Sequence, residues 1–168
     1  QTTVNPVRQA TQDLVKAQWA KIGVDTELKS VNAGVFFSSD AGNPDTAAKF
    51  YTDVEMYTNA PDQPDPTNYL DGWTTKEIAQ KSNEWRGSNP SRYSNPEYDK
   101  IVEQLRSELD PKKRADLIIK ANDIVVNDVA AIPLVARNFP LAGKAKDIKG
   151  YIANSWDSEL WNIQDWSR

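Results

Sequence analysis

At three places in the sequence, an Asn or Asp directly before a proline opens a run of apolar residues at helical spacing. These steps are Asn5-Pro6, Asn95-Pro96 and Asp110-Pro111. The Asn or Asp side chain can accept hydrogen bonds from the free backbone N–H groups of a helix start, and proline suits the first helical position because an N–H there would be unpaired anyway. The sequence therefore predicts helices over Asn5–Ile22, Pro96–Leu109 and Pro111–Asp128.

The second and third of these helices each have an apolar stripe. In the second helix the stripe consists of Tyr98, Ile101, Val102, Leu105 and Leu109. In the third helix the residues on or near the expected buried face are Ala115, Ile118, Ile119, Asn122, Val125 and Val126. Because only a short turn separates the two stripes, we expect the helices to pack as a tight pair.

After Gly23 the pattern changes from helical spacing to alternation. Apolar and polar residues alternate from Val24 to Lys29, which is typical of a half-exposed strand. The predicted strands cover Val24–Ser30, Asp53–Tyr57 and Ile132–Val135. Helices interspersed with strands indicate the α/β (α+β) class, with a small mixed sheet packed by helices.

A loop with three prolines, residues 58–66, follows the predicted strand Asp53–Tyr57. Its prolines exclude a helix or a central strand. The acidic residues Asp62 and Asp65 could belong to a solvated turn, to a calcium loop or to a carboxylate site that holds a cation. Calcium is weakly supported, since the alternating oxygen ligands that end in a bidentate Glu are missing.

The composition narrows the possible functions. The chain has no Cys and no His, which excludes disulfides, thiol-ligated metals and His-dependent catalytic triads. A net charge of −4 argues against nucleic acid as a partner. No stretch approaches the ~18 apolar residues of a membrane-spanning helix, and the first residues lack the pattern of a signal peptide.

Two other function classes stay open from the residues alone. Six tryptophans and many carboxylates would suit a carbohydrate-active enzyme or a carbohydrate-binding module, in which aromatic rings stack on sugars. A purely structural interaction domain is the third possibility. Because any acidic protein offers pairs of carboxylates, neither alternative has specific support from the sequence.

Several segments, taken in order, resemble the solute-binding proteins of ABC importers, in the class that binds oligopeptides, dipeptides and nickel. The segments are residues 15–24, Asp53-Val54, Asp62 with Asp65-Pro66, Tyr69-Leu70, residues 92–100, Asp110 with Arg114, and Asp128 with Ile132-Pro133-Leu134. Together they span roughly positions 7 to 137. Each segment is modest alone, and the resemblance depends on the whole series.

The resemblance implies one part of a two-lobed protein that closes on its ligand by hinge bending, with no enzymatic activity and no cofactor. Residues 1–137 would form the second-lobe α/β domain, and residues 138–168 a tail that returns toward a first lobe absent from this chain. The implied partners are a small peptide or oligosaccharide and the permease subunits of the transporter. The implied location is periplasmic or extracellular, with membrane association through an absent N-terminal segment.

The resemblance also implies a ligand site in the loop of residues 58–66. Asp62 stands where peptide-binding members have the aspartate that holds the α-ammonium group, and Tyr57, Asn59 and Gln63 complete the candidate ligand-binding set. Asn59 replaces an aromatic residue that peptide binders often have. An oligosaccharide therefore stays a second possible cargo, with Asn59, Asp62 and Gln63 as hydroxyl partners. Nickel is the least expected cargo, since no His or Cys is present.

Overall fold

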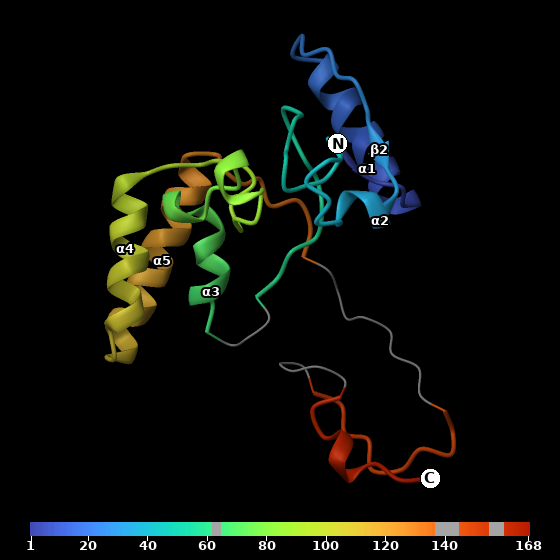
Figure 1. Ribbon diagram of the computed structural model, residues 1–168, viewed down its shortest axis with the longest axis vertical. Coiled ribbons are helices and arrows are strands. Elements are labelled where there is room, and N and C mark those ends of the chain that lie inside the picture. Colours follow the sequence, from blue (N-terminus) through green and yellow to red (C-terminus); the bar gives the residue numbers. More distant parts are fainter. Residues whose placement is uncertain (62–64, 137–144, 155–159) are drawn as a thin grey trace.

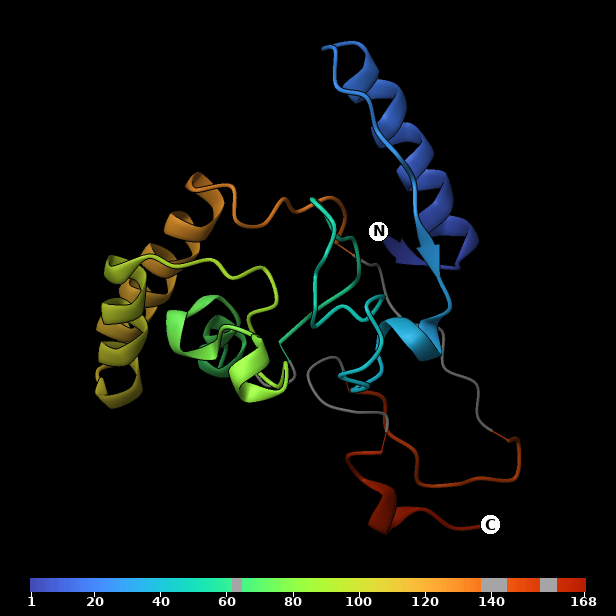
Figure 2. The ribbon, with the colours of Figure 1, turned by 45° about the horizontal axis from the view of Figure 1, so that its top comes forward.

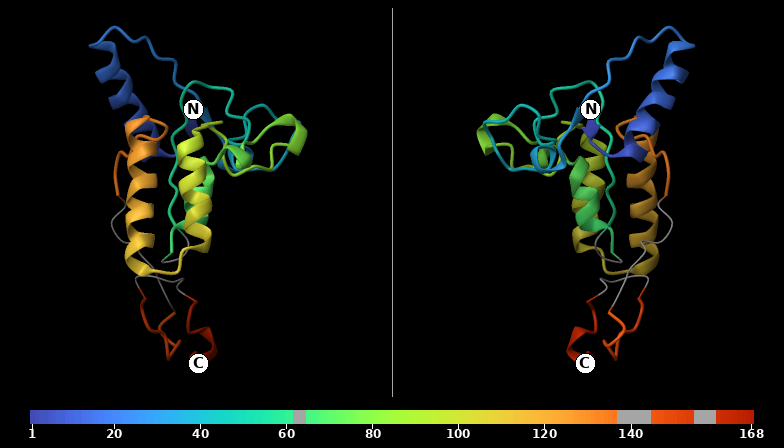
Figure 3. Two further views of the ribbon diagram at one scale, coloured as in Figure 1. Left: turned by 90° about the vertical axis from the view of Figure 1, so that its left-hand side faces the viewer. Right: turned by 90° about the vertical axis from the view of Figure 1, so that its right-hand side faces the viewer.

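The computed structural model of the chain describes residues 1–61, 65–136, 145–154 and 160–168. Its elements are β1 (Thr2–Thr3), α1 (Pro6–Ala20), β2 (Ser30–Val31), α2 (Ala33–Phe36), α3 (Thr67–Leu70), η1 (Asp71–Trp73), η2 (Thr75–Glu77), η3 (Lys81–Asn83), α4 (Pro96–Ser107), α5 (Pro111–Asn127) and η4 (Ile163–Asp165), where η marks a 3₁₀ helix. Figures 1 and 2 show α3, α4 and α5 gathered in one part of the molecule, and α1 with β2 in another. The last described residues lie at the opposite end of the molecule from α1 (Figures 1 and 3).

The three predicted helix starts are confirmed. The Asn5 side chain accepts hydrogen bonds from the N–H groups of Val7 and Arg8 at 3.0 and 3.2 Å. Asn95 does the same for Glu97 and Tyr98 at 2.9 and 3.3 Å. Asp110 accepts from the N–H of Lys113 at 2.8 Å. In each case proline is the first helical residue, so local sequence alone determines where α1, α4 and α5 begin.

The main core lies where α3, α4 and α5 pack on one another. The buried residues of this core are Leu70, Tyr98, Ile101, Val102, Leu105, Ala121 and Val125. The Tyr98 hydroxyl donates a hydrogen bond of 2.6 Å to the carbonyl of Leu70, so the ring is buried without leaving its polar group unpaired. The stripe predicted for α4 is confirmed except for Leu109, which lies beyond the helix and is 89% exposed.

The buried face of α5 differs in part from the predicted one. Ala121 and Val125 are buried, with Leu117, Ile118 and Ile124 packed beside them. Ala115, Ile119, Asn122 and Val126 are exposed, contrary to the prediction. The stripe that faces α4 is narrower than the run of apolar residues in the sequence, because two neighbouring residues on a helix point about 100° apart.

The described strand pairing centres on β1, which the sequence analysis did not predict. Thr2 and Thr3 pair in parallel with Ser30 and Val31 of β2. Thr2 also bridges Met56 in parallel, and its hydroxyl donates to the Met56 carbonyl at 2.5 Å. The chain start therefore lies between two segments that are far apart in sequence, and both threonines are almost fully buried.

The predicted strands are too long. The first, Val24–Ser30, is a strand only at its end, where β2 begins at Ser30, and the second, Asp53–Tyr57, keeps the single bridge at Met56. The third, Ile132–Val135, has no ladder partner within the described residues, and Val135 is 83% exposed. Alternation marks residues able to form strands, but a strand exists only where a second segment pairs with it.

The apolar stripe of α1 is not covered by any described part of the chain. Val7 and Leu14 are 75% and 65% exposed, and Ile22 just beyond the helix is exposed as well. The buried residue of the helix is Gln12, whose amide donates to the Lys29 carbonyl at 3.4 Å. No helix in the described residues is long and apolar enough to cross a membrane.

The described residues of the tail make contacts with one another. Lys149 and Ser167 form an antiparallel bridge, and the ring of Trp166 lies 5.7 Å from that of Tyr151. The Trp166 indole donates to the side chain of Asn162, which in turn donates to the Gly150 carbonyl at 2.7 Å. Residues 145–154 and 160–168 thus stabilise each other.

Candidate functional site

Tyr57 ends the segment that leads into the proline-containing loop of residues 58–66, which we call the proline loop. Its ring makes edge-to-face contacts with Phe36 and Phe37, with centroid distances of 6.0 and 6.3 Å. Phe36 is fully buried, whereas Tyr57 and Phe37 are 38% and 55% exposed. Burial, and then the nearby Glu55 carboxylate, raise the pKa of the Tyr57 hydroxyl, which therefore stays a neutral donor and acceptor. The packed rings of Tyr57, Phe36 and Phe37, which we call the aromatic group, therefore stabilise the start of the loop.

The structure places some of the predicted ligand-binding residues and not others. Asn59 is exposed, and its side-chain oxygen accepts a hydrogen bond of 3.0 Å from the N–H of Ala60. Asp62 and Gln63 lie outside the described residues. Tyr57 and Asn59 are therefore placed at the start of the loop, and the assignment of all four residues to a ligand stays a prediction.

The far end of the proline loop is held by a cluster of polar contacts around Asp65. The Asp65 carboxylate accepts hydrogen bonds from the Thr67 N–H at 2.9 Å and from the Thr67 hydroxyl at 2.5 Å. It also forms an ion pair with Arg114 of α5. The bonds from Thr67, and then the contact with Arg114, lower the pKa of Asp65, so this carboxylate stays ionised at neutral pH.

The arginine of this cluster is fixed by backbone groups as well. One nitrogen of the Arg114 guanidinium donates to the carbonyls of Leu105 and Glu108, both at 2.8 Å, and the other also contacts the Thr67 hydroxyl at 3.1 Å. The two carbonyls belong to the end of α4, where carbonyl groups lack partners within the helix. A hollow of about 340 Å³ lies here, lined by Asp65, Thr67, Asn68, Leu105, Arg106 and Arg114.

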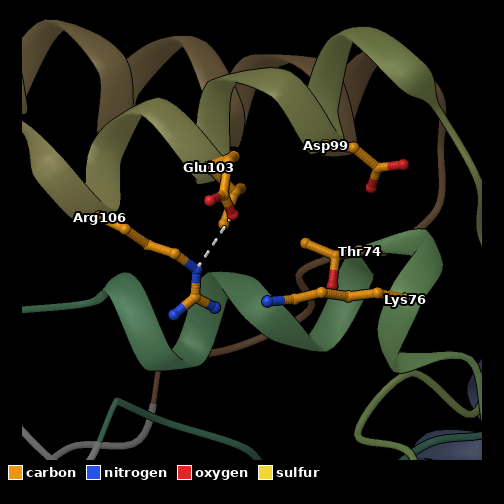
Figure 4. A pocket seen from close by; sticks show the side chains of 6 residues that line it. Thr74, Lys76, Asp99, Glu103 and Arg106 are labelled. Carbon is orange, nitrogen blue, oxygen red and sulfur yellow. Dashed lines mark ion pairs between the residues drawn. The ribbon is translucent and has the colours of Figure 1, made fainter.

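A second hollow, of about 210 Å³, lies between α4 and the residues that follow α3 (Figure 4). Three of the charged side chains that line it interact with neighbouring groups of the protein. Arg106 pairs with Asp71 and lies 3.7 Å from Glu103, and Asp99 accepts a hydrogen bond of 2.8 Å from the Thr75 N–H. We interpret this hollow as part of the helix packing, because the side chains of Arg106, Glu103 and Asp99 interact with neighbouring groups of the protein.

Several of these contacts cannot be recognised from the sequence. Phe36 and Phe37 contact Tyr57 about twenty residues later, and no local sequence pattern predicts this contact. The Asp65–Thr67 contact could have been found, since an Asp two residues before a Thr favours a side-chain-to-backbone turn. Among the described residues, no cluster of three or more potential ligands could hold a metal ion.

Comparisons with known proteins show what the chain resembles. No family model matches it. It is 26% identical over 141 residues to the dipeptide-binding protein DppE of Bacillus subtilis, covering 80% of this chain and 23% of that protein. It is 25% identical over 163 residues to the probable D,D-dipeptide-binding periplasmic protein DdpA of Escherichia coli, covering 97% of this chain and 28% of that protein.

A solved structure shows the same fold. The crystal structure of NikZ from Campylobacter jejuni, in complex with Ni(L-His), superposes with a TM-score of 0.68 and 16% identity over 99% of this chain and 32% of that one. The resemblance to peptide-binding solute-binding proteins and the α/β fold class are thereby confirmed. The relatives are binding proteins rather than enzymes, and the chain spans about a quarter of the length of the curated relatives it matches.

Proposed function

We propose that this chain is part of an extracytoplasmic solute-binding protein that captures small peptides for an ABC importer and catalyses no reaction. The observation that carries the proposal is the similarity to a dipeptide-binding periplasmic protein over 97% of the chain. The same relatives support a periplasmic location. Association with permease subunits, and with the membrane through another segment, follows from this role.

The exposed apolar surface supports the presence of a first lobe outside this chain. Val7 and Leu14 form a stripe on α1 that the described residues leave open, and Leu134 and Val135 are exposed as well. Apolar stripes on helices of soluble proteins are normally buried against another element. A first lobe that packs on these residues would account for the exposure, and the ligand would bind between the two lobes.

The proline loop is the part of the chain that we assign to the ligand. Its start is supported by the aromatic group around Tyr57 and its end by Asp65, Thr67 and Arg114. A carboxylate at Asp62 would suit the α-ammonium of a peptide: at ~4 Å and an effective dielectric of about 20, the attraction is roughly 4 kcal/mol before desolvation. Asn59 and Gln63 would bind neighbouring polar groups of the ligand.

A peptide fits the observations better than the other cargoes. The curated relatives above have peptides in their names, which favours a peptide over an oligosaccharide. The likeness to NikZ is too distant in sequence to transfer its nickel ligand, and this chain offers no His or Cys. The alternative of a carbohydrate-active enzyme depends on tryptophans and carboxylates. Two of the tryptophans have packing contacts: Trp73 is partly buried against the core of α3, α4 and α5, and Trp166 contacts Tyr151 in the tail.

The test is calorimetric titration of the full-length protein and of this chain alone with Ala-Ala, N-acetyl-Ala-Ala and maltotriose. We expect the full-length protein to bind Ala-Ala, and blocking the α-ammonium to abolish binding. The isolated chain should bind weakly or not at all, because ligand pockets enclose most of the ligand surface. Binding of maltotriose without Ala-Ala would overturn the peptide assignment, and equal affinity in both proteins would overturn the two-lobe arrangement.

A further inference from the structure

We infer that Arg114 is a positioning residue for the proline loop: it acts through Asp65 to set the end of the loop in the conformation that binds ligand. The inference rests on the proposed function. Arg114 and Asp65 are 49 residues apart, and their ion pair joins α5 to the loop. No comparison assigns a role to either residue.

Backbone carbonyl groups at the end of α4 orient the guanidinium of Arg114 independently of its contact with the loop. One nitrogen bonds to two carbonyls at the end of α4, those of Leu105 and Glu108, and this leaves the other nitrogen facing Asp65 and the Thr67 hydroxyl. The planar guanidinium of arginine can donate to the α4 carbonyls and to Asp65 at the same time, whereas the ammonium group of a flexible lysine side chain cannot. The helix pair therefore dictates where Asp65 lies.

Asp65 connects the oriented guanidinium to the backbone at the start of α3. Its carboxylate accepts from both the N–H and the hydroxyl of Thr67, the first residue of α3. The loop end is thus tied to α3 by local bonds and to α5 by the ion pair. The Arg114 side chain is 23% exposed and the Asp65 side chain 50% exposed, so the ion pair is partly shielded from solvent on the arginine side.

A neighbouring ion pair provides a matched control. Arg106 of α4 pairs with Asp71 of η1, so it also joins the helix pair to the segment after the loop. Neither Arg106 nor Asp71 makes a contact with Asp65 among the bonds described. A general loss of stability should therefore appear in both Arg114 and Arg106 variants, whereas a loss of loop positioning should appear only in the first.

The first measurement is amide hydrogen exchange at Thr67 in Arg114→Met, Arg114→Lys and Arg106→Met. We expect exchange at least about tenfold faster in Arg114→Met, partial recovery in Arg114→Lys, and a wild-type rate in Arg106→Met. If Arg114→Met fails to fold, Arg114→Lys decides, because it keeps the charge. An unchanged rate in the Arg114 variants, or an equal increase in Arg106→Met, would overturn the inference.

The second measurement is the affinity of the full-length protein for Ala-Ala. We expect roughly tenfold weaker binding in Arg114→Met and in Asp65→Asn, no further loss in the double variant, and a change of less than about twofold in Arg106→Met. Additive losses would overturn the coupling. If the wild-type protein does not bind Ala-Ala, the proposed function is wrong, and the exchange rates alone then decide the role of Arg114.

Discussion

The hydroxyl of Tyr93 donates a hydrogen bond of 2.5 Å to the carboxylate of Asp128, which joins the segment before α4 to the end of α5. Asn95, the residue that caps α4, donates to the same carboxylate at 2.9 Å. The carboxylate of Asp128 therefore joins the start of α4 to the end of α5. These bonds, the one from Tyr93 first, lower the pKa of Asp128, and burial raises the pKa of Tyr93 to about 12.

We expect Tyr93→Phe to lower the melting temperature by about 2–4 °C at pH 7, as measured by circular dichroism. Because the pKa of Asp128 is lower in the folded state, its contribution is present above the ordinary carboxyl range, about pH 4, and is lost as the pH falls further. The difference between wild type and variant should therefore shrink in acid. Tyr51→Phe, on an exposed ring, is the control. An undiminished difference at pH 2 would contradict the role of the ionised Asp128.

The core between α4 and α5 gives a second prediction. Leu105 is fully buried, whereas Leu109 is 89% exposed just beyond the same helix. We expect Leu105→Ala to reduce the free energy of unfolding in urea by about 2–5 kcal/mol, because it leaves a cavity. Leu109→Ala should change it by less than about 0.5 kcal/mol. Equal effects would show that the apolar stripe of α4 does not form the core.

The parts of the fold that could be predicted from the sequence are those that local contacts determine. A capping Asn or Asp, the proline after it and an apolar stripe all belong to a single helix. The starts of α1, α4 and α5 and the packed face of α4 therefore follow from residues that are close in sequence. Strands depend on a distant partner. Nothing near Thr2 indicates that it pairs with Ser30 and Met56, and nothing near Ile132 shows whether a ladder partner is available.

The same limit applies to the candidate site. The proline loop and its acidic residues are visible in the sequence, since proline excludes regular structure there. The contacts that hold the loop come from elsewhere: Phe36 packs on Tyr57, and Arg114 pairs with Asp65. The resemblance drew attention to Asp65 and Arg114 separately, but their pairing required the three-dimensional arrangement of α5 and the loop.

Glu55 gives a prediction of pH dependence. One oxygen of its carboxylate is buried without a hydrogen-bond partner in the described structure, and burial raises its pKa to about 7 from an ordinary 4.5. The positive charges of Arg92 and Lys29 oppose this shift without cancelling it. A carboxyl group whose pKa is raised by folding favours the folded state in its protonated form, so stability should fall as the pH rises from about 4.5 through 7.

We expect Glu55→Gln to remove this fall, because the amide resembles the protonated acid. The melting temperatures of wild type and variant should agree near pH 4.5 and diverge above pH 7, where the variant is the more stable. Melting curves at half-unit steps of pH would measure the effect, with Glu27→Gln, at an exposed residue, as the control. A wild-type melting temperature that stays constant from pH 5 to 8 would show that Glu55 is solvated.

The last prediction concerns Asp62 and separates the possible cargoes. Asp62→Asn keeps the size of the side chain and removes its charge, so a peptide ammonium in a closed cleft would lose its partner. Removing one side of a buried charge pair costs roughly 2–5 kcal/mol, so the affinity of the full-length protein for Ala-Ala should fall by about 30-fold to several thousand-fold. A sugar has no charge and can bond to an amide, so its loss should be closer to ~1 kcal/mol. The measurement is a calorimetric titration, with Asp40→Asn in the exposed loop that follows α2 as the matched control. Peptide binding left intact by Asp62→Asn would show that Asp62 is a turn residue, and the cation would then need another partner.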